Sequence, residues 1–133
     1  MLKNALLALS ALCSFAGCGQ PEFQVVVPLA VINFAPADGA VDIATATNPT
    51  VCFNREMSTS VAAQNLQLET DSGAAVAAQA VVATPDAHCL TISHPVLAQG
   101  AGYVIHAKKG LAASDGTALA TDITARFRTA VQL

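Results

Sequence analysis

The stretch NLQLETDSGAAVAAQAVVATPDAHCLTIS, residues 65–93, decides the expected fold. Bulky apolar residues alternate with polar ones in Asn65–Thr70 and His88–Ser93, and Asp71-Ser72-Gly73 provides turn residues after the first of these runs. Alternation of period two is typical of strands with one buried face. The stretch therefore predicts strands at 65–70, 75–83 and 88–93, with a hairpin turn at 71–73.

The same alternation of apolar and polar residues continues on both sides of this stretch. Short runs bounded by Gly, Pro, Asn or Asp predict further strands at residues 29–34, 49–54, 103–108 and 123–129, and a short edge piece at 41–43. No segment carries a convincing apolar stripe of helical period, although the Ala-rich piece Ser58–Gln64 could form a helical turn. At 133 residues the chain has room for one domain of ordinary size. The sequence therefore predicts a single all-β domain built as a sandwich.

Composition limits the partners that the chain can bind. Charged residues make up only 11% of the chain, with six Lys and Arg against nine Asp and Glu and no run of like charge. Nucleic acids and anionic lipid surfaces require a basic stripe. We therefore expect no nucleic-acid partner.

The first eighteen residues are organised like a bacterial export signal. Lys3 lies in a short polar start, and residues 5–16 form an apolar run broken only by Ser10 and Ser14. The run is too short to cross a bilayer, which needs about 20 apolar residues. A charged start, a short apolar middle and small residues at its end are typical of a cleaved signal peptide.

The end of this segment, Phe15-Ala16-Gly17-Cys18, resembles the lipobox of bacterial lipoproteins. The resemblance implies removal of residues 1–17, a diacylglyceryl group on the Cys18 thiol and acylation, for example by palmitate, of the new amino terminus. Two or more acyl chains suffice for stable membrane anchoring. Gly19, rather than Asp, after the lipidated residue implies sorting to the outer membrane where the cell has one. An ordinary soluble secreted protein, cut after Ala16, stays open as the alternative.

Residues 18–28 are expected to form a short tether, stiffened by Pro21 and Pro28, between the lipidated Cys18 and the folded domain. The expected organisation is thus a signal peptide at 1–17, a lipidated cysteine and tether at 18–28, and a β-sandwich domain at 29–133. It implies an extracytoplasmic protein that contacts the membrane through its lipid.

A series of short motifs runs through the domain: Pro36-Ala37-Asp38-Gly39-Ala40-Val41, Phe53 with Met57, Leu90-Thr91-Ile92, Leu97 through Tyr103, Gly110 with Asp115-Gly116, and Phe127-Arg128-Thr129. In this order they resemble the bacterial Ig-like domain first described in S-layer proteins, the SbsA-type Ig-like domain. The resemblance spans residues 29–130 and implies an immunoglobulin-like β-sandwich of about seven strands. It assigns framework roles to Gly39 in a turn, to the buried ring and hydroxyl of Tyr103, and to Phe127 in the core. Framework residues indicate fold and leave function open.

Cys52 and Cys89 remain in the domain once Cys13 is removed with the signal and Cys18 is acylated. The bulky residues of both strands occupy the alternate positions, so both cysteines are expected to face away from the core. In the resembled topology the two strands are neighbours in one sheet, which implies that the thiols lie opposite each other on its outer face. In an oxidising compartment they would then form a disulfide, with two free thiols as the alternative.

Other polar residues give no pattern typical of a metal or catalytic site. His88, His94 and His106 lack the spacing of zinc ligands, and no acidic loop has the density of carboxylates that calcium requires. The aspartates 38, 42, 71, 86 and 115 lie mostly beside Gly or Pro and are expected to serve in turns. No nucleophile motif or paired carboxylate is recognisable. We therefore expect no cofactor and no enzymatic activity.

Two functions remain open at this point. The first is a non-catalytic, membrane-anchored envelope lipoprotein whose domain is a structural or protein-interaction module, with an envelope protein or glycan as partner. The second is a ligand- or carbohydrate-binding accessory subunit of an envelope system. Sugar-binding faces usually carry exposed Trp or Tyr, whereas this chain has no Trp and one Tyr, so the composition favours the first.

Overall fold

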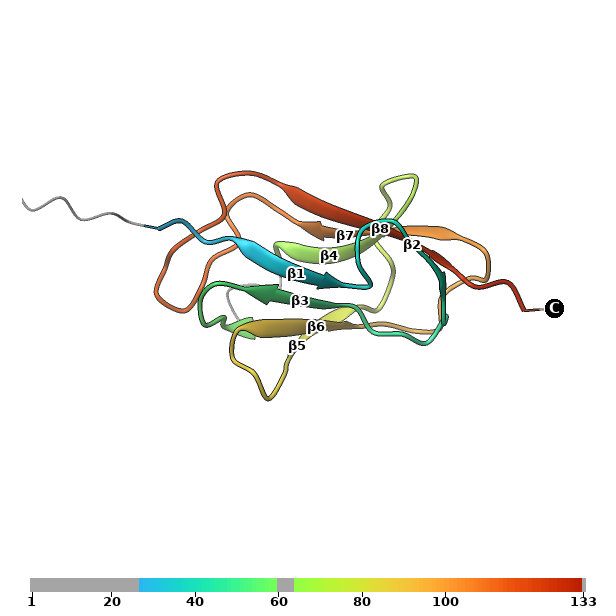
Figure 1. Cartoon of the computed structure of the whole chain (residues 1–133), viewed down its shortest axis with the longest axis horizontal. Helices are drawn as coiled ribbons and strands as arrows, with labels where there is room; N and C mark the ends of the chain where they lie inside the picture. The colour runs from blue at the N-terminus through green and yellow to red at the C-terminus, as the bar shows by residue number, and fades with distance from the viewer. Residues whose placement is uncertain (1–26, 60–63, 133) are drawn as a thin grey trace, which may run out of the picture.

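The computed structural model describes residues 27–59 and 64–132, which form an all-β sandwich (Figure 1). Its strands are β1 (Val31–Ala35), β2 (Ala40–Ile43), β3 (Thr50–Phe53), β4 (Leu66–Thr70), β5 (Ala80–Ala83), β6 (Cys89–Ser93), β7 (Gly102–Ala107) and β8 (Ile123–Thr129). The expected signal peptide, Cys18 and most of the expected tether lie outside the described residues. Within the described ranges, no helix is long and apolar enough to span a membrane.

The strands form two four-stranded sheets, with the orders β1-β3-β6-β5 and β2-β8-β7-β4. In the letters used for immunoglobulin domains these are A-B-E-D and A′-G-F-C. β2 runs parallel to β8, and the other neighbouring strands are antiparallel. The described residues contain eight strands rather than about seven, because the short edge piece 40–43 pairs with β8 and becomes a full member of its sheet.

The core fills the space between the sheets with the alternate residues of each strand. Val51 and Phe53 of β3 are fully buried, and Leu68 of β4 and Ile105 of β7 meet them from the other sheet. Because every second residue points inward, the remaining residues of these strands form the two outer faces of the sandwich. The predicted strand periodicity is therefore confirmed.

Tyr103, near the start of β7, fixes the connection from β6. Its ring is buried and stacks on Phe127 with the ring centroids 5.8 Å apart. Its hydroxyl accepts a hydrogen bond from the Ala98 N–H at 2.9 Å. A tyrosine at this place, bonded to backbone a few residues upstream, is the tyrosine corner of Ig-like domains. The framework role expected for Tyr103 is thus confirmed.

The predicted strand at 75–83 and its hairpin with 65–70 are wrong in part. Only residues 80–83 form a strand, which pairs with β6, whereas β4 pairs with β7. Residues 74–76 still lie beside β4, since the Val76 N–H donates to the Leu68 carbonyl at 2.9 Å. The chain then crosses to the other sheet through Ala78, whose φ is 58°. Alanine side chains have too little bulk to reveal from the sequence to which sheet such a segment belongs.

The chain enters the sandwich at one end and leaves it at the opposite end (Figure 1). The helical turn considered for residues 58–64 falls largely on residues 60–63, which lie outside the described part of the chain.

Candidate functional site

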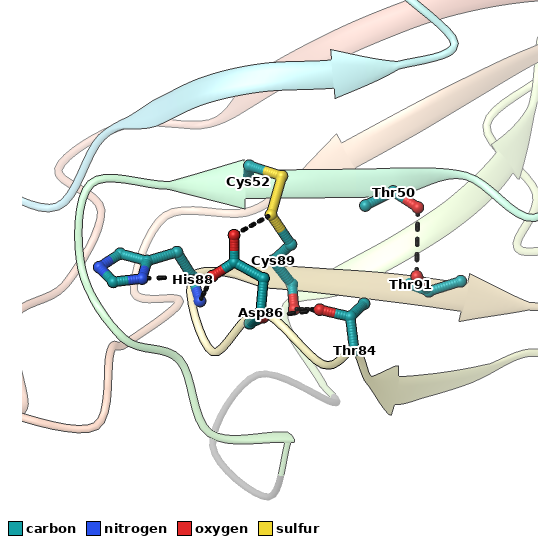
Figure 2. The surroundings of a disulfide bond; sticks show 7 residues. All are labelled: Thr50, Cys52, Thr84, Asp86, His88, Cys89 and Thr91. Carbon is teal, nitrogen blue, oxygen red and sulfur yellow. Dashed lines mark hydrogen bonds and ion pairs between the residues drawn. A yellow bond between two sulfur atoms is a disulfide. The ribbon is translucent and has the colours of Figure 1, made fainter.

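Cys52 of β3 and Cys89 of β6 form a disulfide on the outer face of their sheet (Figure 2). The two residues are directly opposed, with Cα atoms 4.0 Å apart. The neighbouring Phe53 N–H donates to the His88 carbonyl at 2.8 Å. Since hydrogen-bonded and non-hydrogen-bonded pairs alternate along an antiparallel ladder, the cysteines occupy a non-hydrogen-bonded pair, where opposed Cα atoms come closest. The structure therefore brings together the two thiols that the parity of their strands places outside the core.

The loop before β6 is fastened around this disulfide. An Asp86 carboxylate oxygen lies 3.7 Å from Cys89 Sγ, and the other accepts the His88 N–H at 2.9 Å. The Thr84 hydroxyl donates to the Asp86 carbonyl at 2.6 Å and lies 2.9 Å from the Cys89 carbonyl (Figure 2). These contacts give Asp86 the role in a turn that the sequence predicts.

The sheet that holds the disulfide has an outer face without charge. None of the residues of β1, β3, β5 and β6 is charged. We call the outward residues of the last three strands the uncharged face; they are Thr50, Cys52, Ala80, Val82, Cys89, Thr91 and Ser93. Within it, the Thr50 and Thr91 hydroxyls lie 3.1 Å apart and share a hydrogen bond.

The opposite sheet carries a network of ionisable residues instead. His106 of β7 lies between Glu69 and Asp122, with Nδ1 2.9 Å from a Glu69 oxygen and Nε2 2.9 Å from an Asp122 oxygen. The other Asp122 oxygen accepts the Lys109 N–H at 2.7 Å. This hydrogen bond first, and the bond to His106 second, hold the pKa of Asp122 below its ordinary value. The network joins β4, β7 and the segment that precedes β8.

The other two histidines also lie against nearby structure. His88 Nδ1 is 3.4 Å from Asp86, on the loop before β6. The ring nitrogens of His94 each lie 2.6 Å from a carbonyl oxygen, one of Thr47 and one of Pro95. Among residues 27–59 and 64–132, no group of three His, Cys, Asp or Glu side chains is placed to hold a metal ion.

Two side chains after β3 fasten the segment through which the chain enters the domain. Asn54 accepts the Ala30 N–H at 2.9 Å and donates to the Pro28 carbonyl at 3.1 Å. Arg55 donates to the Val27 carbonyl and lies 3.2 Å from Asp115. The hydrogen bond from the Thr117 N–H is the main cause that lowers the pKa of Asp115, and Arg55 adds to it. We call Asn54 and Arg55 the entrance clamp.

A hollow of 320 Å³ lies over β2 and β8, with Arg126, Arg128 and Asp71 in its lining. Arg126 is 3.7 Å from Asp71, and Arg128 donates to the Gly100 carbonyl at 2.8 Å. The Asp71 carboxylate lies directly over Gly102, where any Cβ would collide with it. The charged groups of this hollow therefore contact one another and the backbone of the domain.

Sequence reasoning missed the entrance clamp and the part played by Gln79. The Gln79 amide accepts the Leu68 N–H at 2.6 Å and donates to the Leu68 and Val76 carbonyls at 2.9 and 2.7 Å. It thereby occupies the open edge of β4 in place of a further strand. Asn and Gln are common on loops, so their identity alone gives no signal of such partners. In the sequence, the residues of the uncharged face belong to three separate uncharged runs, which only the sheet order brings together.

The chain is similar in sequence to a known family and in fold to several solved structures. A family model described as a bacterial Ig-like domain matches residues 25–129. The solved structure of CopC from Methylosinus trichosporium OB3b is similar, with a TM-score of 0.64 and 18% identity, over 79% of this chain and 98% of CopC. Domains 1–6 of the surface layer protein SbsC match with a TM-score of 0.58 and 16% identity, over 81% of this chain and 14% of SbsC. The N-terminal part of the bacterial S-layer protein SbsC matches similarly, with a TM-score of 0.58 and 16% identity, over 80% of this chain and 24% of that one. No curated protein matches the chain in sequence.

Proposed function

Because the chain belongs to the bacterial Ig-like domain family, we propose that it is a non-catalytic envelope lipoprotein whose Ig-like domain is a structural or protein-interaction module. The observation that carries this proposal is the Cys52–Cys89 disulfide on an exposed sheet face. Disulfides persist in oxidising compartments and are rare in the cytoplasm. The disulfide therefore supports export, the step that the N-terminal eighteen residues predict.

The anchor is the second part of the proposal. Cys18 is proposed to carry the lipid, and residues 19–28 are proposed to connect it to the domain. The entrance clamp supports this arrangement, because Asn54 and Arg55 hold residues 27–30 against the body of the domain. A tether fixed in this way would limit how far the sandwich can turn relative to the membrane.

The polar residues support a module that binds or spaces rather than one that catalyses. His106, Glu69 and Asp122 bond one another, and Asp38 accepts the Arg126 N–H at 2.9 Å, so these groups hold strands and turns together. The one tyrosine is buried with its hydroxyl bonded to backbone, which leaves no tyrosine to stack on a sugar. These contacts favour the structural or interaction role over the carbohydrate-binding alternative.

The anchor is tested by expressing the full chain in a bacterium and fractionating the envelope. We expect the unsubstituted chain in the detergent-soluble membrane fraction, with the mass of an acylated protein that begins at Cys18. Cys18→Ser should give an unprocessed or soluble product, whereas Cys13→Ser, which changes a cysteine inside the signal, should behave as the unsubstituted chain. A mature chain that begins at Gly17 and lacks acyl mass would refute the anchor.

The non-catalytic role is tested by a broad hydrolase screen of the same preparation, for which we expect no turnover. Reproducible turnover that is lost on substitution of His88, His94 or His106 would contradict it.

A further inference from the structure

The four edge strands of the described sandwich differ in how their free backbone edges are protected. Gln79 and residues 74–76 cover the edge of β4. β2 has four residues and an irregular register, with Asp42 at a φ of 56°. β1 is interrupted by a bulge and is bounded by Pro28 and Pro36. Short, bulged, charged or covered edges are the usual ways in which proteins prevent strand pairing with another chain.

β5 is as short as β2, with four residues, but among the described residues it has no bulge, no charge and no covering segment. Its sequence, Ala80-Val81-Val82-Ala83, contains no charge and no proline, and it pairs with β6 in unbroken register. The next charged residue along the chain is Asp86. Val82 is 40% exposed on the uncharged face, opposite Thr91. No segment of residues 27–59 and 64–132 is hydrogen-bonded along the outer edge of β5, and this edge lies beside a surface without charge.

The backbone groups that β5 presents follow from the ladder. The Ile92 N–H donates to the Pro49 carbonyl at 2.8 Å, so Ile92 directs its backbone groups toward β3. Because these directions alternate, Thr91 and Ser93 direct theirs toward β5, and their partners Val82 and Ala80 complete those bonds. Val81 and Ala83 consequently direct their N–H and C=O groups outward, away from the sheet.

We propose that β5 is a homotypic docking edge, on which the β5 strand of a second copy of this chain pairs in antiparallel orientation. A two-fold axis at Val82 sets Val81 opposite Ala83 of the second copy and uses every outward backbone group of both strands. The β1-β3-β6-β5 sheet of one copy and the same sheet of the second copy then become one sheet of eight strands. The inference deepens the interaction role proposed above and is independent of the lipid anchor.

A second copy fits this edge better than an unrelated chain for two reasons. An antiparallel strand pair is self-complementary about a two-fold axis, so the edge needs no other sequence. The chain carries a net charge of −3, which opposes association elsewhere, but neither β5 nor the adjoining strand β6 contributes a like charge at the contact.

The register gives a sharp test with engineered cysteines. Val82 faces Val82 of the second copy in a non-hydrogen-bonded pair, the same kind of pair that holds the Cys52–Cys89 disulfide. Val82→Cys in the full chain should give, on mild oxidation, a disulfide-linked dimer on a non-reducing gel. Ala80→Cys is the matched control. Ala80 is also exposed on this face, but in the same register it is separated from Ala80 of the second copy by several residues. Both variants also contain Cys13 and Cys18, and the unsubstituted chain measures how much cross-linking these two cysteines give.

Backbone donors provide a second test that leaves the internal ladder intact. In the Val82→Cys background, Ala83→Pro removes an outward N–H and should abolish the cross-link, whereas Ala83→Ser keeps the N–H and should retain it. We expect a several-fold larger dimer fraction for Val82→Cys than for Ala80→Cys. Equal cross-linking of the two, or cross-linking that survives Ala83→Pro in a protein of unchanged melting temperature, would overturn the proposal. Membrane association that persists in Cys18→Ser, with the Val82→Cys cross-link still formed, would refute the anchor alone.

Discussion

Cys52 and Cys89 are 37 residues apart in the sequence, so the bond between them closes a long loop in the unfolded chain. In the chain-entropy model such a loop stabilises the native state by roughly 3 to 4 kcal/mol. We expect a reductant to lower the melting temperature of the protein, and Cys52→Ala to lower it about equally while removing the effect of the reductant. Cys13→Ser serves as the control. A melting temperature that is unchanged by reduction would contradict the structural role of the bond.

Asp122 is the residue at which stability should depend on acid pH. Hydrogen bonds from the Lys109 N–H and from His106 lower its pKa in the folded protein below the ordinary value of 3.8. A carboxylate with a lowered pKa adds stability above its unfolded pKa, and this contribution disappears as the pH falls through the folded pKa. We therefore expect Asp122→Asn to lower the free energy of unfolding at pH 6 and to flatten its fall below about pH 4. Urea unfolding across this range measures both, and a pH profile parallel to that of the unsubstituted chain would contradict the prediction.

Single residues also show which features could be predicted from the sequence and which could not. The outward direction of Cys52 and Cys89 was predictable, because bulky neighbours fix the parity of each strand and parity is a local property. The partners of Gln79 and Asn54 were not, since their amides bond backbone that only the tertiary fold brings near.

Among the elements, β4 depends on a side chain to complete its edge. The Gln79 amide donates to two carbonyls, of Leu68 and Val76, and accepts from the Leu68 N–H. Gln79→Glu keeps the shape and the acceptor but sets carboxylate oxygen against both carbonyls. We expect a loss of about 1 to 3 kcal/mol in the free energy of unfolding at pH 7, partly recovered at acid pH where the carboxyl is protonated. Gln99→Glu, an exposed substitution in another loop, is the control; equal unfolding free energies of the two variants would contradict the role of Gln79.

Where bulky apolar residues occupy alternate positions, the bounds of the strand were predictable to within one or two residues. β8 was predicted at its observed bounds, Ile123–Thr129. The segment 75–83 was not, because its alanines alternate without a difference in bulk that would assign a face. Its crossing between sheets depends on Ala78 and Gln79, whose conformation and bonds are set by the packed sandwich. Local pattern thus predicted the strands, while the protection of edges and the open edge of β5 required the topology.

At the scale of the whole molecule, we propose that the anchor and the entrance clamp together orient the sandwich relative to the membrane. Val27 lies nine residues after Cys18. An extended chain spans at most about 3.6 Å per residue, so the clamped end lies within about 32 Å of Cys18, the proposed site of lipidation. The Arg55–Asp115 contact places the segment around Ser114 at this end. The loop that holds Val96 lies at the opposite end beside the chain's exit, since the Gly100 N–H donates to the Ala130 carbonyl.

This arrangement predicts that the two ends differ in their distance from the membrane. A fluorophore on Ser114→Cys, an exposed position, should be quenched more strongly by a quencher in the lipid headgroups than the same fluorophore on Val96→Cys, whose side chain is 75% exposed. The full acylated chain in vesicles is the sample, and a soluble quencher, to which both sites should respond alike, is the control. Asn54→Ala removes the bonds to Pro28 and Ala30 and should reduce the difference between the two sites, because the domain can then turn about a longer free tether. Equal lipid quenching at both positions in the unsubstituted chain would mean that the clamp does not orient the sandwich.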